Sequence, residues 1–191
     1  MYDADDWLVR ARDLGALLAE REERHTLLIV GGFAMQVQGL GTRTMTRDLD
    51  AWGRLVDGVL ESASPLPETL VSAVAAIARV HDVDAKWLNT QVAAELLDKP
   101  WPDGIVDRAR PIELGGLTLL VVDRIDLVHL KLAAASRSGN FSPRRVDEKH
   151  RADLRALAPT PAELADAVEW IRHAWGDAHA EVAVELVEED H

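Results

Sequence analysis

The sequence has 191 residues, and its 33 acidic side chains against 21 basic ones give a formal net charge of −12. A hydrophobic content of 48% with only 12 Gly and 8 Pro excludes disordered and collagen-like chains. The absence of cysteine excludes disulfide frameworks, thiolate zinc sites and cysteine nucleophiles, and the acidic balance disfavours extended, sequence-indifferent contact with nucleic acid.

The composition also sets an expectation for location. The first six residues include three aspartates, whereas a signal peptide begins with basic residues. The longest apolar runs, such as residues 27–30 and 117–122, are much shorter than the about 20 residues that cross a bilayer. We therefore expect a cytoplasmic protein that makes no contact with membranes.

The N-terminal part predicts a helix, a strand, a second helix and a second strand. Apolar residues at spacings of three and four predict an amphipathic helix over residues 3–23. The apolar run 26–30 predicts a buried strand that ends at Gly31-Gly32, and residues 33–38 predict a short helix. Residues 48–52 alternate polar and apolar side chains, which predicts a strand with one buried face.

The middle of the chain predicts two helices and a hairpin. Residues 67–80 have helical spacing, and a second short helix is expected around 88–97. Strands are expected over 105–114 and 117–122, joined by a two-residue turn at Gly115-Gly116. Since this hairpin is antiparallel and other strands are joined through helices, we expect a mixed sheet.

The C-terminal part is predicted to be helical, over residues 126–135, 146–157 and 161–175. Residues 181–190 fit a strand or a helix. The predicted class is therefore α/β: a small mixed sheet flanked by helices over residues 1–122, with a mainly helical part over 123–191 packed on it.

Two aspartates carry the first chemical signal. Asp48 and Asp50 are two positions apart on one predicted strand, so their carboxylates project from the same face and can share hard divalent cations. Two like charges side by side require a cation or an arginine. The alternative is a solvated edge strand whose acids pair with Arg43, Arg47 or Arg54.

The glycine pair before the second predicted helix carries the second signal. Gly31 and Gly32 let backbone N–H groups approach an anion, although such a pair is also typical of a plain tight turn. Attack on a nucleotide's phosphate needs a metal ion, a binding site for the triphosphate and a positive charge nearby. Magnesium on Asp48 and Asp50, the glycine turn and a nearby arginine would supply these.

These residues resemble a known family. Residues 28–39, LIVGGFAMQVQG, with Arg43, Thr46 and the Asp-Leu-Asp of 48–50, resemble the opening of the DNA polymerase beta superfamily of nucleotidyltransferases. The likeness is greatest to its AbiEii-like group, known from abortive-infection and toxin–antitoxin systems. The resemblance implies a nucleotidyltransferase fold in which Gly31 and Gly32 hold nucleotide phosphates and the paired aspartates bind magnesium. Arg43 would contact phosphate or the turn.

A second block resembles the family's later motifs. Residues 126–134 carry Lys131, and Asp153 lies in the segment 149–154. The resemblance implies that Lys131 contacts nucleotide phosphate and that Asp153 positions Lys131 or the acceptor. The alternative for Lys131 is a surface lysine whose stem covers apolar side chains. A loop with Arg137, Arg144 and Arg145 is a candidate landing site for an RNA end, or a plain solvated surface.

The resemblance leaves one ligand unassigned. Many members of the superfamily use a third carboxylate as metal ligand and general base. Asp84, Asp107 and Glu113 are the candidates, and each fits a surface acid better.

The leading hypothesis is a magnesium-dependent nucleotidyltransferase that moves a nucleoside monophosphate from a nucleoside triphosphate to an RNA or protein hydroxyl, as the toxin of a toxin–antitoxin pair with a cognate antitoxin. The alternative is a catalytically inactive nucleotidyltransferase-like module that acts through a protein partner, which the net charge of −12 would suit if that partner is basic. A purely structural protein requires both motif blocks to be coincidence.

Overall fold

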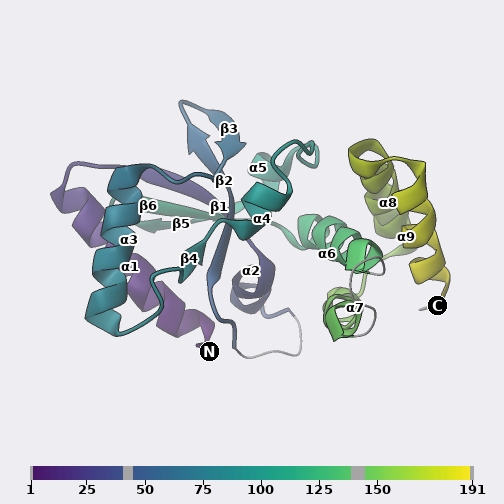
Figure 1. Cartoon of the computed structure of the whole chain (residues 1–191), viewed down its shortest axis with the longest axis horizontal. Coiled ribbons are helices and arrows are strands. Elements are labelled where there is room, and N and C mark those ends of the chain that lie inside the picture. The colour runs from purple at the N-terminus through teal and green to yellow at the C-terminus, as the bar shows by residue number, and fades with distance from the viewer. Residues whose placement is uncertain (1, 41–44, 139–144, 190–191) are drawn as a thin grey trace. The chain divides into compact units, whose positions relative to one another are not determined.

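The computed structural model describes residues 2–40, 45–138 and 145–189, and the side chains within them except at 137, 138 and 145–147 (Figure 1). Backbone contacts divide the chain into two compact units. The first unit contains the described residues up to Gly39, from 45 to Leu97, and Val106–Val122. The second contains Leu40, Asp98–Ile105 and the described residues from Asp123 onward.

The first unit is a mixed α/β layer structure built on a six-stranded sheet. The strands run in the order β3-β2-β1-β6-β5, and β4 pairs with β2. The pairs β1–β6 and β2–β4 are parallel and the other pairs are antiparallel, so the expectation of a mixed sheet is confirmed. The elements are α1 (Ala4–Glu20), β1 (His25–Val30), α2 (Gly31–Val37), β2 (Leu49–Val56), β3 (Val59–Ser62), α3 (Glu68–His81), β4 (Leu88–Asn89), α4 (Gln91–Glu95), β5 (Arg110–Leu114) and β6 (Leu117–Val121).

The central strand β1 is buried on both faces. All four side chains of its last four residues, 27–30, are in the core. Such continuous burial requires cover on both sides of the sheet, and helices provide it. Helix α1 packs on β5, β6 and α3, as Figure 1 shows, while α2 packs on β1 and β2.

Helix α1 is also tied to the β5–β6 hairpin turn by backbone contact. Its N-terminus is capped by Asp3, whose side chain accepts the N–H of Asp6. Farther along, Gly116 donates its N–H to the carbonyl of Gly15 at 2.8 Å. A Cβ atom at Gly15 would lie 1.5 Å from the carbonyl oxygen of Leu114, so only glycine fits at this crossing.

A bulge interrupts the pairing of β2 with β1. Leu28 pairs with Gly53 and Ile29 with Ala51, so Trp52 is the extra residue. As a result Ala51 and Trp52 are both buried, and the predicted alternation of polar and apolar side chains stops after Asp50. Trp52 is therefore part of the core.

Two predictions in the middle of the chain were wrong in detail, and one strand was not predicted. The expected helix over 88–97 is divided, because residues 88–89 pair with β2 as strand β4 and the helix begins only at Gln91. The expected strand over 105–114 begins only at Arg110, since Ile105–Arg108 forms the one-turn helix α5. Strand β3 was not predicted, because its exposed edge position gives it little apolar pattern.

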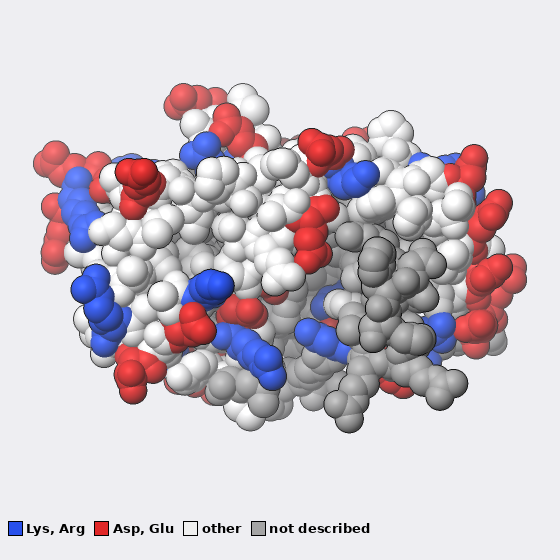
Figure 2. All heavy atoms as spheres, in the orientation of Figure 1, with Lys and Arg blue, Asp and Glu red and all other residues white. Residues whose placement is uncertain are grey.

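The second unit is helical, as predicted. Its helices are α6 (Arg124–Ser138), α7 (Arg145–Leu157), α8 (Pro161–Trp175) and α9 (Asp177–Glu189). Helix α6 packs against the other three. The open choice over residues 181–190 is decided for a helix up to Glu189, which buries Ala180, Ala183 and Leu186. In Figure 2 acidic side chains gather over the part of the surface where α8 and α9 lie.

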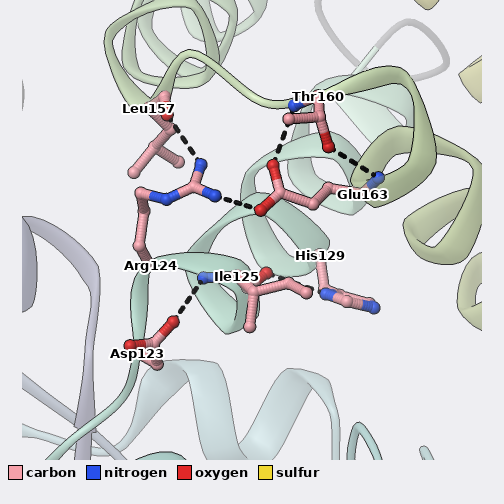
Figure 3. Close-up of polar contacts among 7 residues, drawn as sticks. All are labelled: Asp123, Arg124, Ile125, His129, Leu157, Thr160 and Glu163. Atoms are coloured by element: carbon pink, nitrogen blue, oxygen red, sulfur yellow. Dashed lines mark hydrogen bonds and ion pairs between the residues drawn. The ribbon is translucent and has the colours of Figure 1, made fainter.

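The start of α8 is fixed by a capping box (Figure 3). Thr160 accepts the N–H of Glu163, and the Glu163 carboxylate accepts the N–H of Thr160 at 2.8 Å. Arg124 of α6 donates both to that carboxylate and to the carbonyl of Leu157. The hydrogen bond from Thr160, followed by that from Arg124, lowers the pKa of Glu163 although desolvation opposes the shift.

We expect Glu163→Gln to lower the free energy of unfolding by about 1 kcal/mol at pH 7, because glutamine keeps the cap but loses the charge facing Arg124. Since the pKa of Glu163 is lowered in the folded state, its contribution is present above the unfolded pKa and is lost progressively as the pH falls below about 5. Urea unfolding of the wild type and the variant between pH 7 and pH 4 measures this.

The matched control is Glu169→Gln on the same helix, because the side chain of Glu169 is 69% exposed and pairs with Arg172. We expect this variant to change the stability by less than about 0.5 kcal/mol at either pH. An equal effect of both variants, or a pH-independent effect of Glu163→Gln, would contradict a stabilising contact between the charged Glu163 carboxylate and Arg124.

Candidate functional site

Strand β2 begins at Leu49, one residue later than predicted, so Asp48 lies just before the strand and Asp50 within it, and both carboxylates turn toward Asn89. Both accept a hydrogen bond from one nitrogen, Nδ2 of Asn89, at 2.7 Å to Oδ2 of Asp48 and 2.9 Å to Oδ1 of Asp50. Since one atom contacts both oxygens, the two carboxylates lie close together. All three residues are half-buried. The first unit therefore contains a converging carboxylate pair, the kind of donor set that hard divalent cations use.

Strand pairing brings Asn89 to the acids. β4 pairs with β2 in parallel, and the register sets Asn89 beside Asp50. The oxygen of the Asn89 amide accepts the backbone N–H of Gln91 at 3.0 Å. Because the oxygen is engaged there, the amide nitrogen is the atom turned toward the acids. β4 thus supplies hydrogen-bond donors to two neighbouring carboxylates, which offsets their repulsion.

Gly31 and Gly32 lie in contact with the segment that carries the acids. Gly31 has a φ of +73°, and a Cβ atom there would lie 2.2 Å from Oδ2 of Asp50. A Cβ atom at Gly32 would lie 2.8 Å from Oγ1 of Thr46. A side chain at Gly31 or Gly32 would therefore have to displace the side chain of Asp50 or of Thr46, and the positive φ of Gly31 also favours glycine there.

An aromatic cluster supports the segments that lead into the site. The rings of Trp7 and Trp87 stack 5.9 Å apart, and Trp87 directly precedes β4. The guanidinium of Arg10 lies over the rings of Tyr2 and Trp7. Tyr2 and Thr46 in turn exchange two backbone hydrogen bonds of 2.9 and 2.8 Å. Packing thus anchors the chain just before the acids and just before β4.

The third carboxylate stays unassigned. Within residues 2–40, 45–138 and 145–189, no further acidic, histidine or cysteine side chain joins Asp48 and Asp50 to form a metal-holding group. The three candidates Asp84, Asp107 and Glu113 are all exposed. Asp107 lies in α5 and not in a strand, and Glu113 accepts a hydroxyl from β6.

The structure describes two of the three arginines that were considered as partners of Asp48 and Asp50. Arg54 binds Glu61 across β2 and β3 at 3.0 Å. Arg47 is exposed. Arg43, which the resemblance assigns to phosphate or to the turn, lies outside the described residues.

Lys131 and Asp153 bind each other inside the second unit. Nζ of Lys131 donates to Oδ2 of Asp153 at 2.7 Å, and each side chain is only 8% exposed. The alternative of a surface lysine is therefore wrong. The contact of Lys131 with nucleotide phosphate stays a prediction. Of the expected basic cluster, Arg144 and the side chains of Arg137 and Arg145 lie outside the described part of the chain.

Asn89 is the residue at the site that the sequence did not single out. Asparagine is common in turns, and a two-residue strand has no periodicity that could reveal it. Its contact with Asp50 spans 39 positions of sequence and depends on the pairing of β4 with β2. A polar residue directly after the buried Trp87 and Leu88 is the one local signal.

Comparisons with known proteins assign no family to the chain. No protein-family model matches the sequence, and no curated protein matches it. Within the part that the structure describes, no helix combines the length and the apolar character needed to span a membrane.

We expect Gly31→Ala to lower the free energy of unfolding by at least about 2 kcal/mol, because the new methyl group strains a left-handed backbone and displaces Asp50. Gly39→Ala is the control. Gly39 also has a positive φ, of +68°, but a Cβ atom added there would have nothing within 4 Å. The loss of stability in this variant therefore measures the backbone strain alone. Urea unfolding measures both. Equal losses would show that the contact with Asp50 adds nothing.

We expect Lys131→Met to lower the free energy of unfolding by about 3 kcal/mol, because it removes the cation bound to the buried carboxylate of Asp153. The double variant Lys131→Met/Asp153→Leu should recover at least half of that loss. Urea unfolding tests both, with the exposed Lys86→Met as a control that changes little. A double variant no more stable than the single one would argue against a coupled pair.

Proposed function

We propose that the first unit has the nucleotidyltransferase fold and that the protein is a magnesium-dependent nucleotidyltransferase. The observation that carries the proposal is the convergence of Asp48 and Asp50 on one amide nitrogen, beside the turn Gly31-Gly32. The resemblance of two blocks within residues 26–157 to the AbiEii-like group supports the same conclusion from sequence. On that resemblance the protein would be the toxin of a toxin–antitoxin pair.

The residues fit magnesium. Mg²⁺ is commonly held by one or two carboxylates, with waters and substrate phosphates at its other positions, and a converging pair supplies the protein's share of such a site. Asp48 and Asp50 would hold the ion. When bound, it would neutralise the negative charge of the phosphates and of the leaving group.

The chain's own residues have the remaining tasks. Asp48 and Asp50 would hold the ion beside β2, and Gly31 and Gly32 place backbone next to Asp50 and Thr46. In the proposed reaction a hydroxyl oxygen of an RNA or protein acceptor forms a bond to the α-phosphorus. The bond from that phosphorus to the bridging oxygen breaks, pyrophosphate leaves with the bond's electrons, and the hydroxyl proton passes to water.

One observation favours a second candidate, a nucleotidyltransferase-like module that binds a protein partner and does not catalyse. Asn89 brings an amide to the pair, and an amide cannot act as a general base. The exposed acids of α9 would suit a basic partner. They are Asp177, Glu181, Glu185, Glu188 and Glu189.

We expect Asp50→Asn to reduce nucleotide transfer at least about a hundredfold, because it removes a carboxylate from the ion. The measurement combines the purified protein, Mg²⁺, each of the four α-labelled ribonucleoside triphosphates in turn and cell lysate as acceptor. The matched control is Asp57→Asn, the same substitution at an exposed turn residue of the same unit, which should transfer label like the wild type.

Circular dichroism and urea unfolding confirm that both variants are folded. Full labelling by a folded Asp50→Asn protein would contradict the assignment of Asp48 and Asp50 as the residues that hold magnesium. No labelling by the wild type with any nucleotide would favour the binding module, and the labelled band in a positive assay would give the acceptor class.

A further inference from the structure

Asn89 turns a hydrogen-bond donor toward Asp48 and Asp50, whereas a cation bound there would need an atom with a lone pair as its ligand. Its Nδ2 atom reaches both Asp48 and Asp50, and its Oδ1 atom is engaged by the N–H of Gln91. An amide nitrogen has no lone pair to offer a metal ion. In this arrangement Asn89 therefore adds no ligand and no charge to the site.

The amide also competes with a cation for the same oxygens. Oδ2 of Asp48 and Oδ1 of Asp50 are each in a hydrogen bond below 3.0 Å. The affinity of an oxygen-ligand site for a divalent cation is tuned by the number of charged ligands and by rigidity. With two carboxylates and an amide between them, the site has the composition of a weak binder of free cations.

We infer that Asn89 makes cation uptake conditional on the triphosphate. Free Mg²⁺ or Mn²⁺ binds the pair weakly, and the ion enters together with nucleoside triphosphate, whose phosphate oxygens supply the ligands that the protein withholds. A carboxylate at position 89 would reverse this dependence and turn the pair into a site for free cation. The inference rests on the proposed function in that it takes a triphosphate as the ligand.

The test is a binding experiment on the full chain that needs no catalysis. Mn²⁺ binding is followed by electron paramagnetic resonance and by the shift in melting temperature, without nucleotide and with each of the four ribonucleoside triphosphates. The variant is Asn89→Asp. The matched control is the exchange Asp48→Asn/Asn89→Asp, which has two carboxylates and one amide like the wild type.

For the wild type we expect a dissociation constant for Mn²⁺ alone of about 1 mM or weaker, and a rise in melting temperature only when a triphosphate is present with the ion. Asn89→Asp should bind Mn²⁺ alone at least about tenfold more tightly and gain melting temperature from Mn²⁺ alone. The exchange variant should lose this gain.

Two results would overturn the inference. One is binding of Mn²⁺ by the nucleotide-free wild type as tight as that of Asn89→Asp. The other is a wild type that Mn²⁺ stabilises no better with any triphosphate than without, a comparison that stands even if Asn89→Asp fails to fold. Failure of the catalytic assignment alone has a different signature, because the wild type would then bind Mn²⁺ with triphosphate but transfer no label in the labelling assay.

Discussion

Two like charges held side by side at the start of a half-buried strand are the constraint on which the first unit depends. Such a pair repels itself and loses hydration, so neighbouring groups must compensate. The amide of Asn89 does so directly. Its position depends on the pairing of β4 with β2, on the stacked ring of Trp87 just before it, and on a glycine at position 31 that admits the Asp50 carboxylate.

The second unit also buries a carboxylate, but the group that compensates its charge is different. There the buried carboxylate of Asp153 is bound by an ammonium group, and the charges cancel within the protein. At Asp48 and Asp50 the contact shown is with a neutral amide, which donates hydrogen bonds to both acids but carries no positive charge. The pair Lys131–Asp153 is a structural contact closed within the protein, whereas the role proposed for Asp48 and Asp50 needs carboxylates that can still attract a cation.

Features that depend on local periodicity could be predicted from the sequence. The closeness of the Asp48 and Asp50 carboxylates was expected from the two-residue period of a strand, and the turn at Gly115-Gly116 joins β5 and β6 as its sequence indicates. Features that depend on pairing between distant segments could not. The apolar spacing over 88–97 resembles a helix, and only contact with β2 draws residues 88–89 into the sheet and Asn89 to the acids.

The two hairpin turns of the first unit look alike in sequence, but they differ as places for protein engineering. The turn at Gly115-Gly116 lies under α1, where Gly116 is bonded to the helix backbone. The turn at Asp57-Gly58 between β2 and β3 is exposed, with nothing within 4 Å of a Cβ atom built on Gly58. Fluorescent labels, affinity tags and inserted domains therefore belong at 57–58, where they leave the attachment of α1 to the sheet undisturbed.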